Sequence, residues 1–237
     1  MATPDPLTAA HFLERLHALQ SDDELRKIQR YFKTGEGEYG AGDRFIGVRM
    51  GHVFNLAKEF IDLPPDEIET LLEDDVHEAR AGAVSVMAKQ ASRKTTPPER
   101  RRALFDLYLR RHDRINNWDL VDLGAMHVVG RYLEDQARDV LYDLAGSSNL
   151  WERRTALYAT FHFIRHGETA DALAIAGRLV EDPEDLIQKA TGAVLRAVGG
   201  KELLTFLDQH ASRMPRTMLT TAMEHLTPEQ KAHYRSL

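Results

Sequence analysis

The chain contains no cysteine among its 237 residues. That absence excludes disulfide bonds, thiolate zinc sites, cysteine-bound iron–sulfur clusters and a cysteine nucleophile, and it is compatible with a reducing cytosol. No stretch approaches the roughly eighteen apolar residues that a membrane span requires. Residues 1–8 also lack the basic and apolar regions of a secretion signal. We therefore expect a cytoplasmic protein that makes no use of a membrane.

Several catalytic and cofactor signatures are missing as well. There is no Gly-x-Ser-x-Gly nucleophile elbow, no Gly-Lys-Ser/Thr phosphate loop and no His-Glu-x-x-His zinc motif. The eleven histidines come closest to a ligand spacing at His162 and His166, four residues apart, with no third ligand in view. We interpret this pair as structural, and the sequence predicts neither a metal nor a cofactor.

Net charge is −6, which argues against general affinity for nucleic acid. The charge is nevertheless segregated along the chain. Nine basic residues stand against three acidic ones between Lys89 and Arg114, whereas residues 62–80 are strongly acidic. A local basic face of this kind can bind phosphate, and the alternative is an ordinary solvated helical face.

Apolar residues recur at helical spacing along nearly the whole chain, and no alternating strand pattern or hairpin turn is present. The sequence therefore predicts an all-α protein. The helices are expected over 7–20, 22–33, 50–61, 65–73, 76–92, 98–112, 117–133, 135–145, 150–166, 169–181, 184–198, 201–212, 215–225 and 227–235.

The helices come in pairs, and the second members resemble one another, with small residues in mid-helix. These second helices begin near residues 77, 118, 151, 187 and 215, so the spacing is irregular around three dozen residues. Such spacing is typical of HEAT-like repeats, whose second helices line the concave face of an α-α superhelix. We predict a single domain over 1–237, with N-terminal helices and a glycine-rich loop in 1–49 and the repeat array in 50–237.

The segment 116–122 opens one of these second helices, with Asn116 or Asn117 as a plausible N-cap. Trp118 and Asp122 are four residues apart and therefore share a face. A carboxylate in an apolar helix is costly unless a cation or a hydrogen bond meets it. Basic side chains that could meet this carboxylate lie on the second helices of the later repeats. They are Arg153, Arg154 and Lys189.

Less specific interpretations remain for each of these residues. Trp118 alone is more often a core residue than a site residue. Arg153 and Arg154 could simply form surface ion pairs with Glu152 or Asp182. Asp122 could likewise form an ion pair with Arg154. The glycine-rich segment 35–47 is either a flexible connector or a loop that lets backbone approach a ligand closely.

Four ordered motifs, at 31–45, 117–122, 150–154 and 185–190, resemble the AlkD-type DNA alkylation repair family of HEAT-like-repeat DNA glycosylases. The resemblance covers roughly residues 25–235. It implies excision of alkylated purines such as 3-methyladenine and 7-methylguanine from duplex DNA, without the usual flipping of the base into a deep pocket. A capped solenoid of this size is usually a monomer, so we expect a monomer. The resemblance also implies that Asp122 is the catalytic aspartate and that Trp118 packs on the deoxyribose of the lesion. DNA-facing positions are implied for Arg154, Arg153, Lys189, Arg49 and Tyr31.

One position departs from the family pattern. The family's second cleft tryptophan follows Lys-Ala-x-Gly, and here that position is Ala193. Loss of a stacking contact to a nucleotide costs ~1–3 kcal/mol, so a rate loss of about ten- to a hundredfold is expected. Two alternatives follow: a repeat protein that binds damaged DNA without useful catalysis, and a protein-interaction scaffold.

Overall fold

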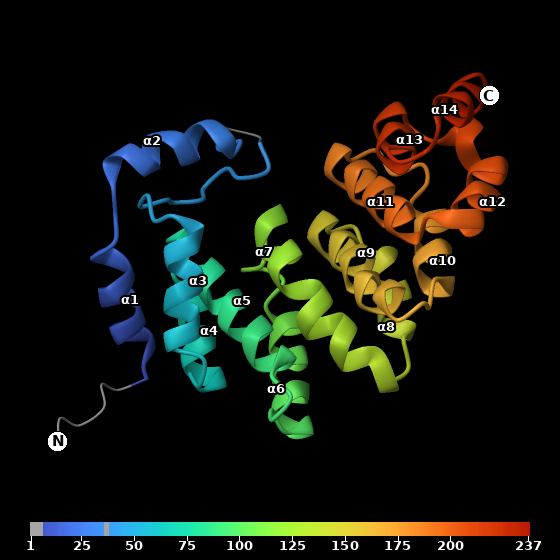
Figure 1. The fold of residues 1–237 in the computed structure, drawn as a ribbon. Coiled ribbons are helices and arrows are strands. Elements are labelled where there is room, and N and C mark those ends of the chain that lie inside the picture. The colour runs from blue at the N-terminus through green and yellow to red at the C-terminus, as the bar shows by residue number, and fades with distance from the viewer. Residues whose placement is uncertain (1–6, 36–37) are drawn as a thin grey trace. The chain divides into compact units, whose positions relative to one another are not determined.

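The computed structural model describes residues 7–35 and 38–237, so Gly37 of the predicted 31–45 motif lies outside the described part. Within the described residues the chain forms fourteen α-helices and no strand, apart from one isolated bridge between Arg44 and Val76 (Figure 1). The predicted all-α class is confirmed. None of the helices described is both long and apolar enough to cross a membrane.

The chain divides into two compact units, residues 1–128 and 129–237. The described helices of the first unit are α1 (Ala9–His17), α2 (Asp22–Tyr31), α3 (Met50–Glu59), α4 (Pro65–Glu73), α5 (His77–Ser92), α6 (Pro98–Arg110) and α7 (Trp118–Gly124). Those of the second unit are α8 (Asp139–Ala145), α9 (Leu150–Arg165), α10 (Ala170–Arg178), α11 (Asp185–Val198), α12 (Gly200–His210), α13 (Arg216–Ala222) and α14 (Pro228–Arg235). The prediction of a single domain stays a prediction.

Most helices begin and end within a few residues of the predicted bounds, and the helix predicted over 117–133 is helical over 118–132 but not α-helical throughout. Its first α-helical part ends at Gly124, a π-helical turn η1 follows over Ala125–Gly130, Arg131 and Tyr132 are α-helical again, and a 3-10 turn η2 covers Leu133–Asp135. A π turn accommodates an extra residue. The hydrophobic periodicity of the sequence does not predict this π turn, because the turn changes which backbone groups are hydrogen-bonded and not which residue types are present.

In the first unit, α5 is the central helix and is packed by α3, α4 and α7. It is buried on nearly all sides. Its small residues permit close packing: a Cβ added at Gly82 would lie 2.4 Å from the ring of Phe12. Gly124 of α7 is equally tight, because an added Cβ would meet the ring of Tyr108 at 2.5 Å.

In the second unit, α9 packs on α11, and α11 packs on α13. Gly192 brings α11 and α13 together, since a Cβ there would approach Thr221 and the carbonyl of Met218 within 2.7 Å. The five helices α5, α7, α9, α11 and α13 correspond to the predicted second helices of the repeats. Within each unit these helices pack on their successors, as in stacked repeats, and the superhelix with a concave face stays a prediction.

The segregated charges of the first unit neutralise one another in the fold. Arg110 and Arg111 reach Glu69 on α4 at 2.6 and 3.2 Å. Arg93 pairs with Asp62 at 2.7 Å, and Arg114 donates to the backbone carbonyl of Leu72. Much of the basic segment 89–114 therefore faces the acidic segment 62–80, and those guanidinium groups are already engaged.

Candidate functional site

The helix that carries Trp118 and Asp122 begins at a well-formed N-cap. Asn117 is in an extended conformation, and its side-chain oxygen accepts a hydrogen bond from the Trp118 N–H at 2.8 Å. Of the two asparagines considered from the sequence, Asn117 is therefore the cap. The cap sets where the helix starts and so where Trp118 and Asp122 fall on its surface.

A buried polar network lies directly behind this N-terminus. His77 Nε2 is 2.7 Å from Asp119 Oδ2, and His77 Nδ1 is 3.3 Å from Asp43 Oδ2. Arg80 donates to the other oxygen of Asp43 at 2.5 Å, and the Asn117 amide donates to Asp43 at 2.6 Å. One end of the glycine-rich loop, the first turn of α5 and the first turn of α7 are thus bound together.

The network is charged at neutral pH. Burial by itself lowers the pKa of His77, but the carboxylates of Asp119 and Asp43 outweigh burial and raise that pKa to about 9. For Asp43, burial acts to raise the pKa, and the hydrogen bonds from His77 and Arg80 reverse this effect and lower it to about 2. An imidazolium between two carboxylates, with Arg80 beside them, satisfies each buried charge.

The loop before α3 is held by one carboxylate. Glu78 is buried, and its side chain accepts hydrogen bonds from the backbone N–H groups of Ile46, Gly47 and Val48 at 2.9 to 3.2 Å. Gly47 has a φ of +79°, and a Cβ there would lie 2.2 Å from the carbonyl oxygen of Ser21. This end of the glycine-rich segment has a defined conformation, and glycine is required there by both backbone angle and space.

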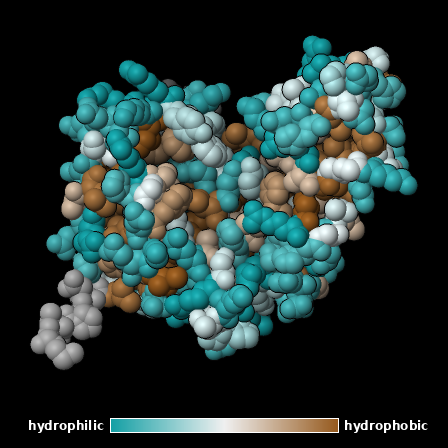
Figure 2. Space-filling model, viewed as in Figure 1, coloured by the Kyte–Doolittle hydropathy of each residue, from teal (hydrophilic) through white to brown (hydrophobic). Residues whose placement is uncertain are grey.

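An open, largely apolar cleft of about 550 Å³ lies between α2, α3 and α7. Trp118 and Asp122 both line it, as their spacing predicts, and both are half-buried. Phe32 stacks on the Trp118 ring with centroids 5.5 Å apart, and Tyr31 meets the ring edge-on at 5.8 Å. In Figure 2, hydrophobic side chains reach the surface beneath α2 among hydrophilic ones.

Two further predicted residues of the first unit lie near this cleft. Tyr31 is 68 % exposed although its ring touches Trp118. Arg49, the residue before α3, is exposed and pairs with Glu24 at 2.7 Å. Both side chains are accessible to a ligand, and Tyr31 belongs to the wall of the cleft itself.

The remaining predicted residues lie in the second unit. Arg153 forms an ion pair with Asp182 at 2.7 Å, which is one of the alternatives that its sequence position left open. Arg154 is buried, donates to the carbonyl of Leu186, and lies 4.5 Å from the centre of the Tyr158 ring. Lys189 is exposed and pairs with Asp185 one turn earlier on α11 at 2.6 Å.

Sequence reasoning missed the residues that hold the site in place. These are Asp43, His77, Glu78, Arg80 and Asp119. Two of them, Asp43 and Asp119, stand inside the quoted motifs, yet their roles depend on partners 34 and 42 residues away. The only available signal was a pair of polar residues, His77 and Glu78, at the start of an otherwise apolar helix.

These features define an all-α protein with a carboxylate and a stacked tryptophan in the wall of an open cleft. The model of the DNA alkylation repair enzyme family matches residues 12–226, and the chain belongs to that family. The predicted resemblance is thereby confirmed, and membership supports a role in DNA repair. Comparison with curated proteins gave no match.

Proposed function

We propose that this protein is a monofunctional DNA glycosylase that hydrolyses the N-glycosidic bond of cationic N3- or N7-alkylated purines in duplex DNA. The observation that carries the proposal is the placement of Asp122 and Trp118 in one accessible cleft. Family membership supplies the class of substrate, which is alkylated DNA.

The chemistry suits a single carboxylate. Alkylation at N3 or N7 puts a positive charge on the purine, so the base leaves without the proton that an ordinary glycoside requires. When the C1′–N bond breaks, its electron pair goes to the purine and an oxocarbenium-like sugar remains. The Asp122 carboxylate stabilises that cation and orients the attacking water, which forms the new C1′–O bond and releases a proton.

Trp118 presents an aromatic face to the same cation. A π face attracts positive charge, and the attraction is larger where water is excluded. Phe32, stacked on the indole, restricts its rotation. The buried network behind Asn117 fixes the start of the helix, so that both side chains are oriented before DNA arrives.

DNA contacts are proposed for Arg154, Lys189, Arg49 and Tyr31, on a concave face formed by HEAT-like repeats. Arg153 and Arg154 are the weaker candidates, because Arg153 is bound to Asp182 and Arg154 is buried and donates to the carbonyl of Leu186. Cations that neutralise phosphates make DNA binding strongly dependent on salt. The proposed reaction uses neither a metal nor a cofactor, and a monomer suffices for it.

The test is release of 7-methylguanine and 3-methyladenine from methylated duplex DNA. Asp122→Asn is expected to abolish release and to leave duplex binding largely intact, because the amide keeps the shape and removes the charge. Asp106→Asn is the matched control, since Asp106 is an exposed aspartate on α6. Equal release by wild type and Asp122→Asn contradicts the proposal.

Ala193 motivates a second candidate function, a DNA-binding protein without useful catalysis. Ala193 is partly exposed on α11, where the family pattern has an indole. This alternative predicts salt-sensitive binding to damaged duplex with no release of base from wild type, and restored release in Ala193→Trp. If the protein binds no DNA even at low salt, the protein-interaction scaffold is favoured over both.

A further inference from the structure

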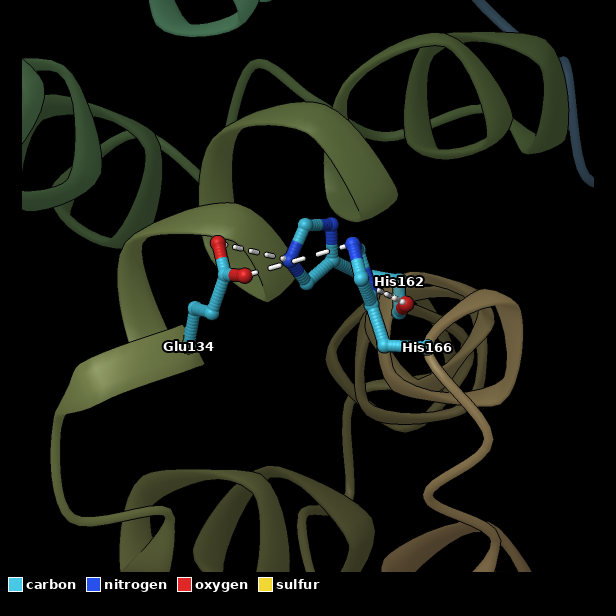
Figure 3. A group of neighbouring side chains, drawn as sticks. All are labelled: Glu134, His162 and His166. Atoms are coloured by element: carbon cyan, nitrogen blue, oxygen red, sulfur yellow. Dashed lines mark hydrogen bonds and ion pairs between the residues drawn. The ribbon is translucent and has the colours of Figure 1, made fainter.

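Three side chains of the second unit converge outside the cleft described above. Glu134 comes from the 3-10 turn η2, His162 from the last turns of α9, and His166 from the residue after that helix (Figure 3). His162 Nε2 lies 3.2 Å from Glu134 Oε2, and His166 Nε2 lies 3.9 Å from Glu134 Oε1. One donor atom from each residue lies within 4.8 Å of the other two.

The fold brings these residues together through a close helix contact. A Cβ added at Gly130 would lie 2.3 Å from the carbonyl oxygen of Ala159 and 2.8 Å from Cβ of His162, so only glycine allows this approach. The chain then turns through η2 and places Glu134 over the end of α9. His162 and His166 share a helix face, with ring centres 4.6 Å apart.

The ring of His166 is oriented by the backbone. His166 Nδ1 is 2.7 Å from the carbonyl oxygen of His162. Because a carbonyl only accepts, Nδ1 carries a proton, and in the neutral imidazole the lone pair is then on Nε2, the nitrogen nearer Glu134. A backbone carbonyl in this position is the partner that commonly orients a metal-binding histidine.

His162 supplies an independent observation. Its side chain is 91 % buried, and its Nε2 has no hydrogen-bond partner although Glu134 is near. A buried nitrogen whose nearest acceptor, Glu134 Oε2 at 3.2 Å, is not aligned for a hydrogen bond is costly and needs an explanation.

We propose that Glu134, His162 and His166 bind a divalent transition-metal ion of the Zn²⁺ class. Two imidazoles and one carboxylate form a ligand set that zinc sites use, with a fourth position open to water. Bonds of 2.0–2.1 Å in a tetrahedral array place donor atoms about 3.3 Å apart. The 3.2 Å between His162 Nε2 and Glu134 Oε2 is close to that value, and the three donor atoms all lie within 4.8 Å of one another. The half-exposed Glu134 and His166 side chains are able to move the remaining distance.

The ion would cross-link η2 to the end of α9. The site is independent of the proposed glycosylase reaction, because none of its three residues lines the cleft. The charge of Arg131 acts on His162 and opposes binding of a cation. Removal of that charge is therefore expected to tighten the site, which gives the proposal a gain-of-affinity test.

The experiment is calorimetric titration of the full chain, free of any affinity tag, with Zn²⁺. One ion per chain is expected for wild type, and at least tenfold weaker binding for Glu134→Gln and His166→Ala. Both variants alter side chains that are half-exposed and are expected to fold. His225→Ala, at an exposed histidine outside the cluster, is the control and should bind as wild type does.

Three further readouts complete the test. Co²⁺ should give the visible absorption of a tetrahedral nitrogen and oxygen site in wild type and lose it in His166→Ala. Arg131→Ala should bind Zn²⁺ more tightly, and millimolar Mg²⁺ should not compete, because Mg²⁺ prefers oxygen ligands. No stoichiometric binding by wild type, or equal binding by wild type, Glu134→Gln and His166→Ala, would overturn the proposal.

Discussion

His77 Nε2 lies 2.7 Å from the carboxylate of Asp119, the residue that follows Trp118. The imidazole at the start of α5 therefore holds the first turn of α7, and through it the indole in the wall of the cleft. The same ring reaches Asp43 in the glycine-rich loop with its other nitrogen. A single buried side chain thus connects three segments that are far apart in the sequence.

The charge on His77 predicts how stability depends on pH. Its pKa is raised to about 9 in the folded protein, against about 6.5 in an unfolded chain. The stabilisation is therefore complete below pH ~6.5 and is lost as the pH rises towards 9, with an upper limit of about 3 kcal/mol. Denaturant unfolding at several pH values should show this loss in wild type.

His77→Gln is the matched variant for that measurement, because it keeps hydrogen-bonding atoms and removes the titrating ring. Its free energy of unfolding should be lower than that of wild type at pH 6.5 and nearly constant up to pH 9. A wild-type stability that is flat or rising over this interval would show that His77 is neutral in the folded state.

Two glycines four residues apart in the chain predict opposite responses to alanine. Gly47→Ala should lower the free energy of unfolding by roughly 2–4 kcal/mol, from the strained positive φ and the clash with Ser21. Gly51→Ala, on the exposed side of α3 with open space around it, should be neutral or stabilise by about 0.5–1 kcal/mol. Denaturant melts of both variants check this, and comparable losses would contradict the packing described for Gly47.

The stack of Phe32 on Trp118 predicts that substitution of Phe32 lowers the proposed activity although the carboxylate of Asp122 is retained. Phe32→Leu should slow base release by roughly two- to tenfold, because an aromatic pair contributes about 0.5–1.5 kcal/mol. Phe54→Leu, in the same cleft from α3, is the control and should have a smaller effect.

Fluorescence gives an independent readout of that stack. The chain has two tryptophans, and Trp151 is buried. In a Trp151→Phe background, Phe32→Leu should shift the Trp118 emission to longer wavelength, since the indole gains contact with water. An unchanged spectrum would mean that Phe32 does not hold the ring.

Substitution of Lys189 is expected to change DNA binding, whereas substitution of Arg153 is expected to change the stability of the fold. Lys189→Ala should reduce the slope of log K against log salt for duplex binding by about 1, as for a phosphate contact. Arg153→Ala should instead lower the free energy of unfolding by about 3 kcal/mol, because it leaves Asp182 buried without its cation. Salt titrations and denaturant melts of both variants separate the two roles, and an unchanged salt slope in Lys189→Ala removes that residue from the DNA contacts.

The amino-acid sequence by itself determined the helices, the shared face of Trp118 and Asp122, and the family. Those features depend on residues a few positions apart, because helical period and caps are local. Even so, the sequence did not show the π turn over Ala125–Gly130, which follows from hydrogen-bond spacing within the helix.

Only the tertiary structure decided which charges meet. Of the interpretations that the sequence allows for Arg153, the fold selects the ion pair with Asp182, 29 residues later. His162 and His166 were an isolated pair until Glu134 was placed over them, and His77 had no assigned role before Asp119 and Asp43 were seen on either side of its ring. Charged partners interact through space, and residues far apart in the chain can lie side by side in the fold. The packing of the buried helices therefore decides which charged residues pair.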